Sequence, residues 1–326
     1  MREQLLADPP QPHVENALWL EPPSNVDRYD DCMARVADGT ARWAKDRGRG
    51  CYRKTIRHGI ASRLVENFRT LCLHRRASVA TLSYASAKPF PHMYFDGLFP
   101  VDVLDALDGE FPEPSAEISH HLFCKNATER GWRCIKDKGR GYLKITNSNE
   151  SAMAEHLNGV ITAMKSRSFV TFLEQLTGIG PLIVDQTNEG SGQHQILPGG
   201  SLQIHADFNR VLSGLYRRVN VFLYLNHDWQ PSWAGDLELW DHSMTKCAAR
   251  IAPLRNRLVV FSSTDFSYHG HADPLRCPSD RSRRSIALYY YTESPAALVD
   301  EDRHSTLYQV RKCESCQMPH VGSGST

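Results

Sequence analysis

Polar and apolar residues alternate from about residue 178 onward, which is the period of a β-strand. The runs that carry this pattern are short, and Gly, Pro, Asn or Asp separates them. They read GQHQIL, SLQIHADF, RVNVFLYLN, GDLELWD, ARIAP, RLVVFSS and RSIALYYYT. Many short strands without intervening helices predict an antiparallel sandwich or barrel in the C-terminal half of the chain.

Helical spacing precedes these strands. Apolar residues recur at i, i+3 and i+4 over residues 150–178, and Gly178 is expected to end the helix. Shorter helices are predicted within ASRLVENFRTLCLHRRA and near VDVLDALDGEF, and a short strand within KPFPHMYFDGLFP. The chain thus divides into an N-terminal extension of unknown role (1–85), a mainly β domain with flanking helices (86–300) and a polar C-terminal tail (301–326) that is expected to be loose.

Composition and charge bear on the cellular compartment and on the class of partner. The chain has 326 residues, a net charge of +1 and nine cysteines. An odd number of scattered cysteines predicts reduced thiols and a cytoplasmic protein. No apolar run approaches the roughly 18 residues of a membrane span, and the N-terminus lacks the apolar region of a signal peptide. The net charge gives no argument for nucleic acid as a partner, and we interpret the basic cluster over residues 42–76 as a solvated face.

The stretch SLQIHADFN contains candidate metal ligands. On a strand, His205 and Asp207 point to the same side, while the apolar residues between them point to the other. A histidine and a carboxylate on one inward face supply two ligands of the site that holds non-haem Fe(II) with open positions. The third ligand should be a histidine from a later strand, and His269 and His271 in FSSTDFSYHGHADP both qualify.

A second polar feature opens the last predicted strand, RRSIALYYYT. Alternation places Arg283 beside the small Ser285, and Arg284 on the same face as the bulkier Ile286. We therefore predict that Arg283 faces the interior of the barrel. A buried guanidinium there can hold a carboxylate through two parallel bonds, which suits a keto-acid co-substrate such as 2-oxoglutarate.

Several segments together resemble the prolyl-hydroxylase-like branch of the Fe(II)/2-oxoglutarate dioxygenases. They are PFPHMYFDGLFP, HADFN, YRRVNVFLYLNHDW, GDLELWD, FSSTDFSYHGHADPLRCP and RSRRSIALYYYT. The resemblance runs from about Lys88 to Thr292. It implies a double-stranded β-helix (jelly-roll) fold and assigns residues 86–300 to a dioxygenase domain.

The resemblance also implies site residues. Fe(II) would be bound by His205, Asp207 and His269, the last because the liganding histidine of the family commonly precedes a glycine. The co-substrate 2-oxoglutarate would be held by Arg283, with Ser285 beside it, and by Tyr224. The sequence departs from the family pattern in two places. One is an insert around RCPSDRS before the arginines, and the other is the sequence Ala-Gly-Asp at 234–236, where many relatives have a double glycine.

With these cofactors and O₂, the expected reaction is hydroxylation of a C–H bond, with decarboxylation of 2-oxoglutarate to succinate. The substrate is a small molecule or a prolyl residue of a peptide. Desaturation, cyclisation or other tailoring by the same core, and a non-catalytic 2-oxoglutarate sensor, are the alternatives. Asp207 argues against halogenation, because the halide occupies the position of the missing carboxylate in such enzymes. The oligomeric state is left open.

Cys313, Cys316 and His320 near the C-terminus have a spacing found in zinc sites. A four-ligand site lacks its fourth member nearby. We therefore expect no metal there.

Overall fold

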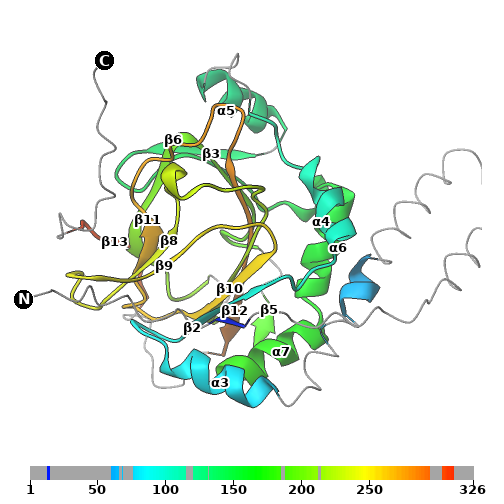
Figure 1. The fold of residues 1–326 in the computed structure, drawn as a ribbon, viewed down its shortest axis with the longest axis vertical. Helices are drawn as coiled ribbons and strands as arrows, with labels where there is room; N and C mark the ends of the chain where they lie inside the picture. Colours follow the sequence, from blue (N-terminus) through cyan, green and yellow to red (C-terminus); the bar gives the residue numbers. More distant parts are fainter. Residues whose placement is uncertain are drawn as a thin grey trace, which may run out of the picture.

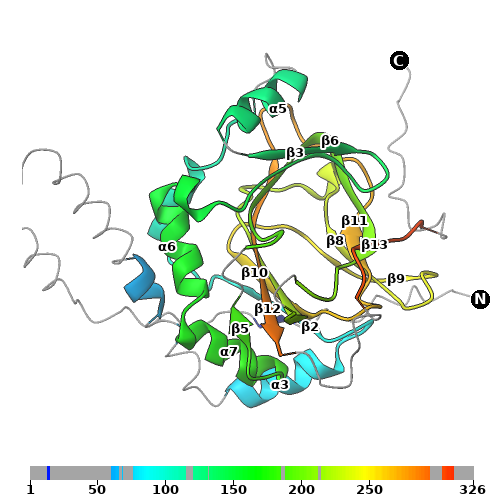
Figure 2. The ribbon, with the colours of Figure 1, turned by 180° about the vertical axis from the view of Figure 1, so that it is seen from behind.

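The computed structural model describes residues 13–14, 60–65, 68, 76–114, 120–130, 132–184, 188–211, 214–293 and 303–311. In this part of the chain one curled sheet dominates, with its strands in the order β1-β2-β10-β7-β12-β6-β11-β8-β9. Helices α3, α4, α6 and α7 lie along one side of the curled sheet (Figures 1 and 2). The predicted fold class, mainly β with flanking helices, is confirmed.

The long strand β6 (Gly192–Ala206) joins two layers of the sheet. Its first half pairs with β12 (Arg283–Thr292) and its second half with β11 (His269–His271). The first layer continues through β7 (Tyr216–Tyr224) and β10 (Arg257–Ser262), and the second through β8 (Leu237–Trp240) and β9 (Cys247–Ile251). The chain passes back and forth between these layers, which is the jelly-roll arrangement.

Helices cover the outer face of the layer that contains β12. They are α3 (Arg76–Ser86), α4 (Val101–Asp108), α6 (Glu155–Met164) and α7 (Arg167–Thr177). The single helix predicted over 150–178 is a 3-10 turn, η1 (Glu150–Ala152), followed by α6 and α7. Ser166 breaks the helix because its hydroxyl caps α7, accepting from the backbone N–H of Phe169. Gly178 ends α7 in the left-handed conformation, as predicted.

Parts of the segment predicted as an N-terminal extension pack into the same core. Strand β1 (His13–Val14) pairs with β2 (His92–Asp96), the strand predicted within KPFPHMYFDGLFP. The ring of Phe68 contacts those of Phe99 and Phe169 at centroid distances of 5.9 and 4.6 Å. The tyrosine of α3, Tyr84, is hydrogen-bonded to Ser262 of β10. The boundary at residue 85 stays a prediction.

A hairpin extends the sheet beyond β6, and a helix precedes this hairpin. The sequence analysis anticipated neither. Strand β3 (Arg133–Asp137) pairs with β4 (Gly141–Asn147), and β4 pairs with β6. Helix α5 (His120–Glu129) precedes the hairpin, and a disulfide between Cys124 and Cys134 joins the two. The prediction that all cysteines are reduced thiols is therefore wrong for this pair. The short β5 (Ile183–Val184) pairs with β12, and a 3-10 turn, η2 (Pro231–Trp233), follows β7.

The C-terminal tail is ordered over residues 303–311, so the expectation of a loose tail is wrong there. Strand β13 (Leu307–Tyr308) pairs with the end of β6, and the backbone N–H of Gln309 donates to Ile204. Cys313, Cys316 and His320 lie outside the described residues. Among the described helices, none has the length and apolar character required to cross a bilayer.

Candidate active site

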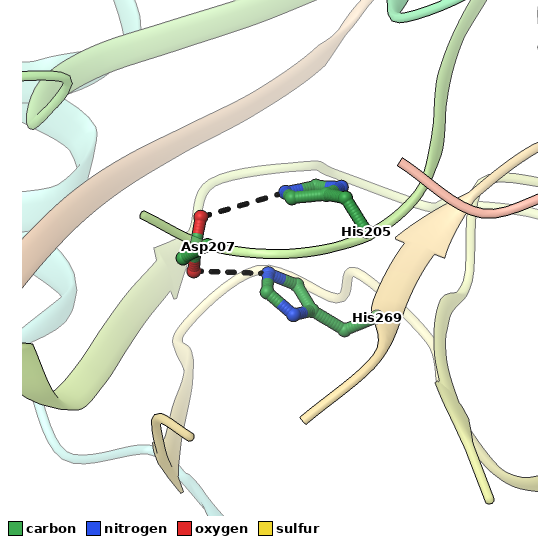
Figure 3. A group of neighbouring side chains, drawn as sticks. All are labelled: His205, Asp207 and His269. Atoms are coloured by element: carbon green, nitrogen blue, oxygen red, sulfur yellow. Dashed lines mark ion pairs between the residues drawn. The ribbon is translucent and has the colours of Figure 1, made fainter. Parts of the chain in front are cut away.

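Three side chains expected to bind metal meet at the open end of the jelly roll. His205 lies near the end of β6, Asp207 follows that strand, and His269 opens β11, where it pairs in register with His205. Figure 3 shows the two imidazoles approaching Asp207 from different strands, with Nε2 to carboxylate distances of 3.5 Å for His205 and 3.4 Å for His269. One ligand atom from each residue lies within 4.8 Å of the others, and all three residues are buried.

The two histidines are oriented for ligation. Nδ1 of His205 lies 2.7 Å from the carbonyl of Gln203, and Nδ1 of His269 lies 2.8 Å from the carbonyl of Ser267. Each Nδ1–H therefore donates to the backbone, which leaves the Nε2 lone pair facing Asp207. Burial lowers the pKa of His269 to about 4, so its imidazole is neutral at neutral pH. Two imidazoles and one carboxylate fit the donor set of Fe(II) in such sites.

Asp207 is fixed by partners on β7. Arg217 approaches its carboxylate to 3.0 Å, and Asn220 donates to it at 2.7 Å. Arg217 also donates to Asn220 at 2.8 Å, and its guanidinium lies 3.3 Å from the centroid of the Tyr289 ring. Burial raises the pKa of Asp207, but its neighbours, above all the charge of Arg217, outweigh burial and hold the pKa well below its usual range. The carboxylate is therefore anionic and oriented before any metal binds.

A buried arginine lies at the other end of the same cavity. Arg283 is 6% exposed and donates through Nε to the carbonyl of Gly235 at 2.7 Å and through Nη2 to the hydroxyl of Tyr224 at 3.0 Å. Ser285 stands opposite Tyr224 in the register of β12 and β7. Burial raises the pKa of Tyr224, which keeps its hydroxyl protonated.

Gly235 has to be glycine because Arg283 packs against it. A Cβ atom at this position would lie 2.6 Å from the side chain of Leu275 and 3.3 Å from that of Arg283, and the residue has a φ of +84°. Many relatives have a double glycine where this chain has Ala-Gly-Asp at 234–236. The chain therefore keeps the glycine that contacts Arg283.

The alternation predicted along β12 is confirmed. Arg283, Ser285 and Tyr289 line the cavity, whereas Ile286, Leu288 and Tyr290 pack under the helices. The neighbouring Arg284 points away from the cavity, to the carboxylate of Glu113 at 2.7 Å and the carbonyl of Asp108 at 3.2 Å.

All six residues expected from the sequence share one cavity of about 310 Å³. Other polar side chains line it that the sequence analysis did not assign to a site: Arg133, Lys144, Thr146, His194 and Tyr308. Four of them lie on β3, β4 and β13, strands that are short or rich in charge and were not predicted, whereas His194 lies on the predicted β6. The alternation of polar and apolar residues in GYLKITN is the signal that would have placed Lys144 on a polar strand face.

His271, the alternative third ligand, also lines the cavity. In the strand register it stands opposite Leu202 of β6. It lies outside the group of three residues that can hold a metal ion.

Comparison with solved structures finds several prolyl hydroxylases. A prolyl 4-hydroxylase of Pseudomonas putida is 18% identical, with 67% of this chain and all of that chain covered and a TM-score of 0.45. A Trichoplax adhaerens prolyl hydroxylase, solved with a hypoxia-inducible-factor peptide, is 16% identical over 70% of this chain and 92% of that chain, with a TM-score of 0.42. A search of curated proteins found no significant match.

A family model gives a more local result. Residues 192–291 match the model of the 2OG-Fe(II) oxygenase superfamily. The match begins with β6 and ends within β12, so it includes the three candidate ligands as well as Tyr224 and Arg283. Enzymes of this superfamily use Fe(II), 2-oxoglutarate and O₂. The strands that build the candidate site thus form a domain of the 2OG-Fe(II) oxygenase superfamily.

Proposed function

We propose that this protein hydroxylates an unactivated C–H bond of a small molecule or of a prolyl residue, and converts 2-oxoglutarate to succinate and CO₂ as it does so. The observation that carries the proposal is the shared cavity. It joins a two-histidine, one-carboxylate cluster to a buried arginine that has a tyrosine hydroxyl beside it.

In this proposal His205, Asp207 and His269 bind Fe(II) and leave the remaining positions to co-substrate and O₂. Bound iron would supply the activation of O₂ that is coupled to loss of CO₂ from 2-oxoglutarate. The backbone carbonyls of Gln203 and Ser267 hold the imidazoles in the required tautomer, and Arg217 and Asn220 orient the carboxylate.

Arg283 and Tyr224 bind the distal carboxylate of 2-oxoglutarate. The Gly235 carbonyl fixes the guanidinium through Nε, so its terminal N–H groups can reach an anion in the cavity. Tyr224 stays protonated and can donate a further hydrogen bond, and Ser285 lies next to both. This arrangement orients the keto-acid end of the co-substrate toward the histidines.

The presence of Asp207 supports hydroxylation over halogenation, because its carboxylate fills the position that a halide would take. The choice between a small molecule and a prolyl residue rests on the motif resemblance to the prolyl-hydroxylase-like branch, which favours the peptide. Desaturation and cyclisation use the same residues and remain alternative outcomes of the reaction.

The decisive experiment measures succinate formation by full-length protein that has been reconstituted with Fe(II) under anaerobic conditions and then exposed to O₂ and 2-oxoglutarate. Iron content and the visible absorption of the iron–2-oxoglutarate complex are recorded for the wild type and for His205→Ala. We expect the variant to lose both signals and all turnover, whereas His242→Ala, which changes an exposed histidine outside the cavity, keeps them.

A non-catalytic sensor would bind 2-oxoglutarate without forming succinate. Equilibrium binding of 2-oxoglutarate, measured beside turnover, separates the two functions. Binding with no succinate from the iron-loaded wild type, with every candidate substrate tried, would overturn the proposed hydroxylase.

A further inference from the structure

The hairpin outside the jelly roll places a lysine inside the cavity. On β4, Leu143 and Ile145 pack into the hydrophobic core, whereas Lys144 and Thr146 line the cavity. In the register, Lys144 and Arg283 both pair with Ile196 of β6, from opposite sides. Two inter-strand spacings, about 10 Å in total, therefore separate their backbones. Lys144 and Arg283 therefore lie two strands apart on one curled sheet and line the same cavity.

Lys144, which is half-buried, differs from the two buried arginines of the cavity because it lacks a partner among the described residues. Arg217 is paired with Asp207, and Arg283 donates to Gly235 and Tyr224. Across the described residues, no hydrogen bond or ion pair joins Lys144 to another group. Burial lowers its pKa to about 8, and of the surrounding charges that of Asp207 acts on it most strongly, ahead of Arg283 and Arg217. Its ammonium thus lines the cavity without a neutralising partner among the described residues.

A buried group in the same cavity, His271, also lacks a partner. His271 is 2% exposed, and neither of its ring nitrogens has a hydrogen-bond partner. Buried polar groups without partners are costly and rare in folded proteins. A polar ligand would satisfy both side chains.

The co-substrate leaves this charge unneutralised. One carboxylate of 2-oxoglutarate is assigned to Arg283 and the other lies at the metal, and Asp207 is already paired with Arg217. Apart from Asp207, the cavity lining contains no acidic side chain, whereas it also includes Arg133, which is exposed at the hairpin. An anion that enters the cavity would therefore find Lys144 without a competing carboxylate partner.

We propose that Lys144, with His271 as a hydrogen-bonding neighbour, binds a carboxylate of the primary substrate and thereby selects acidic substrates. This inference rests on the proposed function, because it takes Arg283 and the metal as the binding groups of the co-substrate. It deepens that function by naming the substrate class: a carboxylic acid, free or at the end of a peptide, whose reacting carbon lies near the metal.

The test uses matched probes, N-acetyl amino acids and the corresponding N-acetyl amino acid amides, added to the iron-loaded full-length protein with 2-oxoglutarate. We expect some acids to raise succinate release above the rate without substrate, and their amides to require about tenfold more probe or to fail. Lys144→Met should remove this preference without raising the 2-oxoglutarate requirement, and Lys144→Arg should retain part of it. Lys136→Met is the matched control, because Lys136 lies on β3, is exposed and does not line the cavity.

Binding of the same probes is measured by saturation-transfer NMR with Zn(II) in place of iron, so the result does not depend on turnover. If the acids bind in a Lys144-dependent way but the protein forms no succinate, the result supports this inference and contradicts the proposed function. An acid preference that survives in Lys144→Met would overturn the inference. So would a Lys144→Met variant whose one defect is a raised 2-oxoglutarate requirement, because the lysine would then bind the co-substrate.

Discussion

The ring of Tyr308 lies over that of His205, with 5.4 Å between the ring centroids and an interplanar angle of 36°. The same two residues are paired in the register of β13 and β6. A residue near the C-terminal end of the described chain thus forms a wall beside a candidate metal ligand, and Tyr308 lines the cavity.

Ion pairs hold this segment, residues 303–311, against the jelly roll. Arg311 contacts the buried Glu238 at 2.9 Å and Asp273 at 3.0 Å, while His304 lies 2.9 Å from Asp265. We predict that Arg311→Ala releases the segment and weakens substrate binding several-fold, while the three candidate ligands still bind iron. Hydrogen exchange over residues 303–311 and the substrate concentration at half-maximal rate are the measurements.

Arg303→Ala is the control, since Arg303 is exposed at the start of the segment. Arg311→Ala removes one partner of Glu238 and should lower the free energy of unfolding by about 1–3 kcal/mol. The loss is no larger because Arg250 and Trp240 still contact that carboxylate. Unchanged hydrogen exchange and unchanged half-saturation in Arg311→Ala would show that the segment is held by its backbone pairing alone.

The two histidines of HGH should respond differently to substitution. His269 pairs with His205 and faces Asp207, whereas His271 pairs with Leu202 and its ring nitrogens have no hydrogen-bond partner among the described residues. His269→Ala should therefore remove iron and all succinate formation, while His271→Ala should keep iron and lower turnover by a smaller factor. Metal analysis of the two variants after identical reconstitution decides the matter. If His271→Ala were the variant that lost iron, the ligand assignment would have to be exchanged.

Lys144 gives the acid preference a pH dependence. Its pKa in the free protein is lowered to about 8, mainly by burial, and only the protonated ammonium attracts a carboxylate. The concentration of an acidic probe at half-saturation should therefore stay flat below about pH 8 and rise above it. The amide probe should show no such rise. Equal pH profiles for acid and amide probes, measured between pH 6 and about 9.5, would contradict this expectation.

The jelly-roll core could be predicted from the sequence because its strands alternate strictly. Ile204 and Ala206 pack into a cluster on one side of β6, and His205 faces the cavity on the other. The wall that carries Lys144 could not be predicted, because β4 joins the sheet through its long-range pairing with β6, and the charged β3 is a strand only as the other arm of that hairpin. The position of Tyr308 could not be predicted for a related reason, since this residue is placed by the two-residue β13 and by ion pairs with residues distant in sequence.

Arg283 and its neighbour Arg284 provide the sharpest test of the co-substrate site, because the two arginines are adjacent in sequence and face opposite ways. Arg283→Leu would leave the distal carboxylate of 2-oxoglutarate unpaired in a buried position, which should cost on the order of 3 kcal/mol or more. That energy corresponds to a rise of about a hundredfold or more in the 2-oxoglutarate concentration needed for half-maximal turnover. Arg284→Leu removes contacts outside the cavity, with the exposed Glu113, the Asp108 carbonyl and the Ser282 hydroxyl, so the same titration should change little. The register supports this contrast, since Ser285, two residues beyond Arg283, stands opposite Tyr224. A large effect confined to Arg284→Leu would refute the assignment, because the carboxylate would then bind on the outer face of β12, among the helices.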